Sequence, residues 1–253
     1  MKSYKEVVEN RYDNEKYDAD SILKNEYSFI NPVGFYGEVK LAYVLKSFVL
    51  QLCKDKELSK IKILDVGCGI GTKTRFLAEF IRNPTNIYGV EYSKNRLEYC
   101  KRLNPYINYE WGDIVKETHE KGGGMFDGII SFTVLSHFST DEEIEKALRN
   151  IYSKILDKGL FLWVDINDKS HKQHMQYNGD SYGFSSREMD SYAGRVGFKL
   201  VKGSGLFKKI PFINTSTYYL ANKIKRIFLL ELLDHLLITP LFPHAYNVRI
   251  YSK

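Results

Sequence analysis

Apolar residues recur along this chain with two different spacings, and the alternation of the two predicts an α/β fold. Five short apolar runs rich in β-branched residues predict buried strands: 61–66, 87–91, 107–111, 126–132 and 160–166. Four stretches with apolar residues at helical spacing predict amphipathic helices: 35–53, 72–81, 141–156 and 185–194. Strands that alternate with helices in this way favour a mostly parallel sheet with helices packed on it.

A glycine-rich turn follows the first predicted strand directly. Gly67, Gly69 and Gly71 stand at alternate positions, and Thr72 or Thr74 is placed to cap the helix that begins there. Glycines let the backbone approach a ligand at the carboxyl end of a strand, where open α/β sheets bind ligands. The spacing G-x-G-x-G differs from the dinucleotide pattern G-x-G-x-x-G, and no G-K-[ST] follows as in a P-loop. An ordinary strand-to-helix turn is the alternative.

In the letters D-V-G-C-G-x-G, residues 65–71 resemble motif I of the class I S-adenosylmethionine (SAM)-dependent methyltransferases. The resemblance extends over residues 61–198. It implies a Rossmann-like fold with a seven-stranded sheet in the order 3-2-1-4-5-7-6. The family pattern places a sixth strand from residue 196 and an antiparallel seventh strand at 247–251.

The second predicted strand ends in a carboxylate, Glu91, 24 residues after Gly67. At this spacing such folds place an acid on ribose hydroxyls, and a carboxylate can accept both hydrogen bonds of a diol. An exposed acid at a helix start is the alternative, although Ser93 already supplies a cap there. The resemblance implies that Tyr92 lies beside adenine, that Asp113 accepts from its amino group, and that the Ile114 N–H meets the ring. The predicted cofactor-binding residues are Asp65, Gly67, Cys68, Gly69, Glu91, Tyr92, Asp113, Ile114 and Ser131.

The segment after the fourth strand carries the candidate catalytic residue, His137, as a general base for a hydroxyl acceptor. Local packing of this histidine is the alternative. Family members that methylate base amines or amides carry [DN]-P-P-[YF] here, whereas this chain has S-F-T-V at residues 131–134, which counts against that substrate class. Candidate substrate contacts are Tyr12, Asp165, His171, His174 and Arg187. Asp165 with the two histidines could suit a divalent metal, but further acidic ligands are missing from the pattern, so we predict no metal.

Composition narrows the class of protein only slightly. The 253 residues carry a net charge of +6, which favours anionic partners without a basic run dense enough for a nucleic-acid arm. Three widely spaced cysteines argue against a disulfide scaffold. The N-terminus is too polar for a signal peptide, and no apolar run reaches about 20 residues. We therefore predict a reduced, soluble, cytoplasmic protein with no nucleic-acid partner and no stable membrane insertion.

The chain is predicted to divide into an N-terminal lid segment, 1–34, and a methyltransferase domain, 35–253. In the resembled family such a segment folds over the cofactor with tyrosines touching cofactor or substrate, and Tyr4, Tyr12 and Tyr17 are candidates. A packed surface helix is the alternative. A helical insertion with an apolar stripe is predicted at 206–246. It has three possible interpretations: a pocket cap, a homodimer surface or a membrane-surface helix.

The predicted function is transfer of a methyl group from SAM to an oxygen of a small molecule, with S-adenosylhomocysteine (SAH) as product. Likeness over the whole chain suggests a sugar, phosphate or phosphoramidate precursor of a bacterial surface polysaccharide (capsule) as the acceptor. The alternatives are an RNA or protein methyltransferase, a lipid or quinone methyltransferase, and a non-catalytic SAM-binding module.

Overall fold

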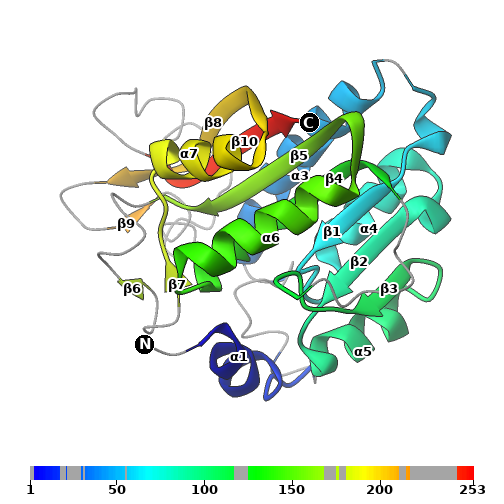
Figure 1. Cartoon of the computed structure of the whole chain (residues 1–253). Coiled ribbons are helices and arrows are strands. Elements are labelled where there is room, and N and C mark those ends of the chain that lie inside the picture. Colours follow the sequence, from blue (N-terminus) through cyan, green and yellow to red (C-terminus); the bar gives the residue numbers. More distant parts are fainter. Residues whose placement is uncertain are drawn as a thin grey trace.

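The computed structural model describes residues 3–17, 21, 30, 32–54, 56–116, 125–167, 175–176, 181–210, 215–216 and 244–253. These residues form an α/β domain in which one twisted sheet has helices on both faces (Figure 1). The predicted fold class is therefore confirmed.

One sheet of eight strands forms the centre of the domain. Its spatial order is β3 (Asn108–Trp111), β2 (Ile87–Glu91), β1 (Ile63–Val66), β4 (Phe126–Phe132), β5 (Ile155–Ile166), β10 (His244–Ser252), β8 (Lys199–Ile210) and β9 (Thr215–Ser216). The first five strands pair in parallel, and β10 runs antiparallel to both of its neighbours. The predicted order 3-2-1-4-5-7-6 is confirmed, and the two-residue β9 extends the edge.

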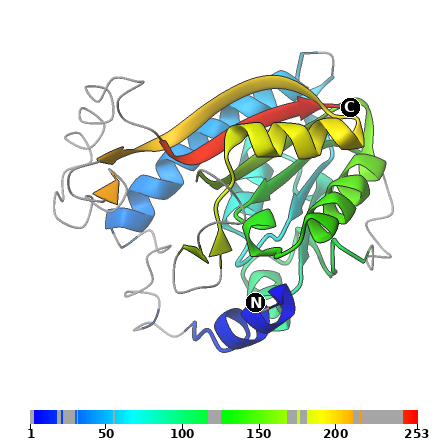
Figure 2. The same cartoon turned by 60° about the vertical axis from the view of Figure 1, so that its left-hand side comes forward.

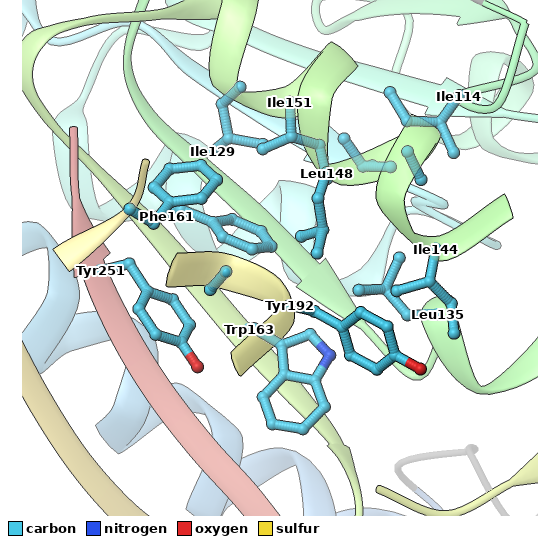
Figure 3. Close-up of a cluster of buried hydrophobic side chains, with 14 of the residues drawn as sticks. Ile114, Ile129, Leu135, Ile144, Leu148, Ile151, Phe161, Trp163, Tyr192 and Tyr251 are labelled. Carbon is cyan, nitrogen blue, oxygen red and sulfur yellow. The ribbon is translucent and has the colours of Figure 1, made fainter. Parts of the chain in front are cut away.

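Long helices cover both faces of this sheet. Residues of α3 (Pro32–Leu52) and α4 (Thr72–Ile81) pack with β1 and β4 in one apolar cluster. On the opposite face, α6 (Asp141–Lys154) and α7 (Ser186–Val196) bury side chains against β4 and β5 (Figures 1 and 3). Phe161 and Trp163 of β5 lie fully buried in this second cluster. A core on each face fixes the strands, so their carboxyl ends form a rigid edge.

The remaining elements are short apart from one helix. They are α1 (Tyr4–Val7), η1 (Val8–Tyr12, a π-helical turn), η2 (Leu58–Lys60), η3 (Pro84–Asn86), α5 (Lys94–Leu103), η4 (Leu135–His137), β6 (Met175–Gln176) and β7 (Ser181–Tyr182). Both views place α1 beside α5 at one end of the domain (Figures 1 and 2).

Polar side chains cap several of the helix starts. Ser93 caps α5 as predicted, and Thr140 caps α6 in a capping box. The prediction that Thr72 or Thr74 caps α4 is wrong. Gly71 holds the cap position with φ 80° and has no side chain to offer. The Thr74 hydroxyl instead donates to the Asp65 carboxylate at 3.1 Å.

Parts of the predicted insertion at 206–246 belong to the sheet. Strand β8 continues to Ile210, and β10 already begins at His244. The apolar stripe between them lies outside the described residues. Within the described part of the chain, no helix has the length and apolar character needed to cross a membrane.

Candidate functional site

A cavity lies at the carboxyl ends of β1, β2 and β4, where the glycine turn, the chain after β2 and the chain after β4 meet. Residues 3–17 form the N-terminal segment, and several of them complete the wall of the cavity. The predicted site residues that line this cavity are Tyr12, Asp65, Gly67, Cys68, Gly69, Glu91, Tyr92, Asp113, Ile114 and His137. Residues spread over 126 positions of sequence thus converge on one space because parallel strands end at a common edge.

Glu91 ends β2 with its side chain almost fully buried. One carboxylate oxygen accepts from the backbone N–H of Gly69 and the other from that of Ser93, both at 2.8 Å. Burial raises the pKa of Glu91, while Arg96 and the backbone donors oppose that rise. Each oxygen keeps a second lone pair for a ligand donor. The backbone therefore fixes this carboxylate in a position to receive two hydroxyl groups.

The glycine turn has a conformation that other residues adopt at a cost. Gly67 and Gly69 have φ values of 67° and 57°. A Cβ atom on Gly67 would also collide with the Val134 side chain from the neighbouring loop. The turn therefore keeps the backbone close to the cavity and aims the Gly69 N–H at Glu91.

Asp65 is a buried acid beneath this turn. Burial raises its pKa to about 7, against the opposing charge of Lys73 and the hydrogen bond from Thr74. Cys68 lies in the turn itself, buried and unoxidised. Both line the cavity.

Asp113, Ile114 and Tyr92 lie together at one end of the cavity. The Asp113 carboxylate accepts from the Tyr4 hydroxyl at 2.6 Å and from the Val115 N–H at 3.1 Å. The ring of Tyr4 packs edge-on against Tyr92, with centroids 5.8 Å apart. The carboxylate expected to meet adenine is thus contacted by the N-terminal segment in this structure.

Three further contacts hold the N-terminal segment to the start of α5. The Arg96 guanidinium makes two hydrogen bonds to the Glu15 carboxylate, at 2.6 and 2.7 Å. The Ser93 hydroxyl donates to Asp13. Arg96 also stacks on the Tyr12 ring, 3.6 Å from its centroid. Sequence reasoning overlooked Glu15 and Arg96, although Arg96 stands in the first turn of the helix that follows Glu91.

His137 ends η4 and lines the cavity. Its Nε2 atom lies 3.0 Å from the Tyr12 hydroxyl, and its Nδ1 atom lies 3.4 Å from the Ser181 hydroxyl. When Tyr12 donates to Nε2, the ring proton belongs on Nδ1 and faces Ser181. An acceptor hydroxyl taking the place of Tyr12 would then meet an unprotonated nitrogen.

Two of the weaker candidates, Asp165 and Arg187, lie away from the described cavity lining. Asp165 is fully buried, accepts from the Ser136 N–H at 3.1 Å and does not line the cavity among the described residues. This hydrogen bond fixes η4 and thereby positions His137. Arg187 is exposed in the first turn of α7. His171 and His174 lie outside the described residues.

Ser131 is a cofactor-binding candidate that the structure places inside the sheet. It lies in β4 between Val66 of β1 and Trp163 of β5. Its buried hydroxyl has no hydrogen-bond partner among the described residues, and it is not part of the described cavity lining. Within the described ranges, no three His, Cys, Asp or Glu side chains gather as a metal site.

The burial of Asp165 predicts a specific pH dependence of stability. Its pKa is raised to about 7, mainly by burial, from an ordinary value of 3.8. Between these values the folded chain keeps a proton that the unfolded chain has lost, so the free energy of unfolding falls as pH rises. One proton gives a slope of about 1.4 kcal/mol per pH unit. Asp65 also has a pKa raised to about 7 and contributes equally to both proteins. Urea unfolding at pH 5, 6 and 7 should therefore show a slope that is steeper in wild type than in Asp165→Asn by about this amount. Asp157→Asn, at an exposed position, is the control; parallel curves for wild type and Asp165→Asn would contradict the assignment.

The pairing of Glu15 with Arg96 predicts how the N-terminal segment is held. Glu15→Ala removes both charge-assisted hydrogen bonds and leaves a half-buried guanidinium without that partner. We expect amide hydrogen exchange in residues 4–12 to accelerate about tenfold or more. Exchange in α6 should not change. Glu57→Ala removes an exposed pair with Lys60 and serves as the control; equal exchange in the two variants would show that Glu15 does not anchor the segment.

Parts of this chain are similar to known methyltransferases. Residues 63–159 match the family described as a methyltransferase domain. The tRNA (carboxymethyluridine(34)-5-O)-methyltransferase of Saccharomyces cerevisiae is 29% identical over 119 residues, which cover 46% of this chain and 40% of that protein. The ubiquinone biosynthesis O-methyltransferase of Rickettsia akari is 27% identical over 139 residues, covering 54% and 50%. The chain thus spans half or less of the length of these two curated relatives.

A solved structure has the same fold over the whole chain. It is magnesium protoporphyrin IX methyltransferase from Synechocystis with bound SAM, with a TM-score of 0.63, 14% sequence identity and coverage of 100% of this chain and 98% of that one. The chain has the Rossmann-like fold of class I methyltransferases. Residues 63–159, which match the methyltransferase-domain family, contain β1, the glycine turn, Glu91, Asp113 and His137.

SAM is the cofactor that this domain fits. The fixed Glu91 carboxylate suits a ribose diol, and Asp113 with the apolar side chains of Ile114 and Phe138 suits an adenine ring. The glycine turn leaves the backbone open toward the cavity next to Glu91. The residues present therefore match the chemistry of the ligand at each place the structure describes.

Proposed function

We propose that this chain transfers the methyl group of SAM to an oxygen of a small molecule. One observation carries the proposal: Glu91, Asp113 and His137 line a single cavity at the carboxyl ends of the strands. The first two suit the cofactor, and the third is a titratable group within reach of a bound acceptor. The names of both curated relatives describe O-methyl transfer and support oxygen as the acceptor atom.

SAM supplies a methyl group bound to a positively charged sulfur. The acceptor oxygen forms a bond to the methyl carbon while the carbon–sulfur bond breaks. The electron pair of the broken carbon–sulfur bond stays on sulfur. The acceptor proton passes to Nε2 of His137, which serves as general base in this proposal. The N-terminal segment excludes water from the reacting atoms and presents Tyr12 beside that nitrogen.

The proposed acceptor class is a hydroxylated small molecule, with sugar or phosphate precursors of a bacterial surface polysaccharide as the first to test. A quinone or lipid acceptor is the second candidate, favoured by the match to a ubiquinone-biosynthesis enzyme. Transfer to RNA is the third, since the yeast relative is named for a tRNA nucleoside.

Methyl-labelled SAM and an extract of cells that lack the gene separate these candidates. The products are divided into an organic extract, a small-pore filtrate and retained macromolecules. Label in the filtrate is the expected result, and mass spectrometry of that fraction identifies the acceptor. Label in the organic extract would favour the quinone or lipid candidate. Label retained with RNA or protein would overturn the small-molecule proposal, and no incorporation with intact SAM binding would favour a non-catalytic module.

A further inference from the structure

A second cavity adjoins the first where α3 crosses the carboxyl end of β5. Its apolar wall comes from Leu41 of α3, Val164 of β5, Leu206 of β8 and Tyr246 of β10. Gly34 and Gly37 of α3 leave room at its side. One charged side chain, Glu38, lines it at the same place.

One carboxylate oxygen of Glu38 accepts a hydrogen bond, and the other has no partner among the described residues. Its side chain is only 3% exposed, and Oε1 accepts from the Lys73 ammonium at 3.0 Å. The other oxygen, Oε2, is buried and has no hydrogen-bond partner among the described residues. A buried carboxylate oxygen without a donor is unfavourable, so such groups normally have a partner in the functional state. Here the cavity provides the space for one.

Three residues, Lys73, Phe132 and Thr133, line both cavities. Thr133 has a left-handed backbone with φ 52°, and its N–H donates to Val164 at 2.8 Å. The two cavities therefore adjoin at the end of β4, where this hydrogen bond holds the chain. A molecule in the second cavity would lie directly beside a ligand in the first.

We propose that the second cavity binds the methyl acceptor and that Glu38 selects acceptors carrying a hydroxyl or N–H donor next to an apolar ring or chain. The inference rests on the proposed function, which makes the first cavity the cofactor site. The Lys73 charge balances that of Glu38, so the described lining residues provide no net positive charge for a phosphate. Within the proposed acceptor class, this favours the sugar hydroxyls over the phosphates. Oε2 can only accept, so it disfavours an anion and favours a donor. Glu38 is a specificity residue in this proposal and not a catalytic base.

Phenol, anisole and phenyl phosphate test the proposal directly, because they share a ring and differ in the donor. Methyl NMR signals of Leu41, Val164 and Leu206 are followed in the full chain saturated with SAH. We expect phenol to shift these signals and to bind about tenfold more tightly than anisole or phenyl phosphate. Glu38→Gln can turn its amide nitrogen into the cavity, so it should bring phenol and anisole within about twofold of each other. Glu79→Gln, an exposed change of the same charge on α4, should keep the tenfold preference.

Each other outcome overturns the inference. Equal binding of phenol and anisole to wild type, or an unchanged preference in Glu38→Gln, would show that Glu38 does not select a donor. No shift with any of the three probes would show that the cavity is no acceptor site. If SAH alone shifted these signals and prevented phenol from binding, the second cavity would belong to the cofactor site. None of these readings uses turnover, so they are distinct from a failure of SAM binding or of methyl transfer.

Discussion

Replacing Glu91 with alanine is expected to weaken SAM binding about a thousandfold, the largest effect of any substitution considered for this chain. The side chain offers two carboxylate oxygens that the Gly69 and Ser93 N–H groups hold in place. A hydrogen bond to a charged group contributes about 2 kcal/mol, and the ribose diol would make two. The variant also frees the Gly69 N–H and loosens the glycine turn. Calorimetric titration with SAM and with SAH measures the loss.

Two matched variants make the result specific to the carboxylate at this place. Glu91→Gln keeps the volume but loses the charge and one acceptor oxygen, so its loss should be intermediate. Glu98→Gln removes the same charge from the exposed face of α5 and should bind SAM as wild type does. Affinity of Glu91→Ala within threefold of wild type would remove Glu91 from the cofactor site. Thermal unfolding of each variant shows whether the fold is retained.

Replacing His137 with glutamine is expected to lower kcat about a hundredfold while SAM affinity stays near that of wild type. General-base catalysis contributes a factor of this order, because the acceptor oxygen must lose its proton as the new bond forms. Glutamine keeps a polar side chain of similar reach, so the Tyr12 and Ser181 contacts have a substitute. The rate of label incorporation in the extract assay measures kcat, and titration with SAM measures affinity.

The pH profile distinguishes a catalytic role from a structural one. Without the base, the reaction depends on acceptor that has ionised by itself, so the defect of His137→Gln should shrink as pH rises. Tyr12→Phe removes the hydroxyl that contacts Nε2 of His137 and keeps the aromatic ring. Because His137 is still present as the base, this variant should keep the wild-type shape of the pH profile. A defect in His137→Gln that is equal at all pH values would indicate that the histidine only shapes the loop.

Much of the fold could be predicted from the sequence because strands that are buried on both faces of the sheet appear as apolar runs. Strands β2 and β4 have the bounds that their continuous apolar runs predict, since helices cover both sides of them. Edge elements were less well predicted. Strand β8 runs on to Ile210 through exposed and polar residues such as Lys202 and Ser204. Backbone pairing with β10, and with β9 at Lys209 and Ile210, sets that length, and no local pattern reveals it.

The site could be predicted where one segment carries the whole signal and was missed where distant segments meet. The glycine turn, Glu91 and Asp113 each sit at a strand end and were found by spacing and resemblance. The partners Glu15 and Arg96 are 81 residues apart, and each by itself is an ordinary surface charge in sequence. Asp165 shows the opposite case. A polar residue after a strand predicted a substrate contact, but the fold buries it under η4.

The N-terminal segment is attached through groups that line the candidate cofactor cavity. Tyr4 binds Asp113, Tyr12 meets His137, and Glu15 binds Arg96 beside Glu91. Exchange of SAH for a new SAM is then expected to require these contacts to break and re-form in every cycle. Loop motions of this kind take microseconds to milliseconds, and they often limit enzymes whose chemical step is faster. A rapid first turnover followed by a slower steady rate is the kinetic form that such an attachment would give.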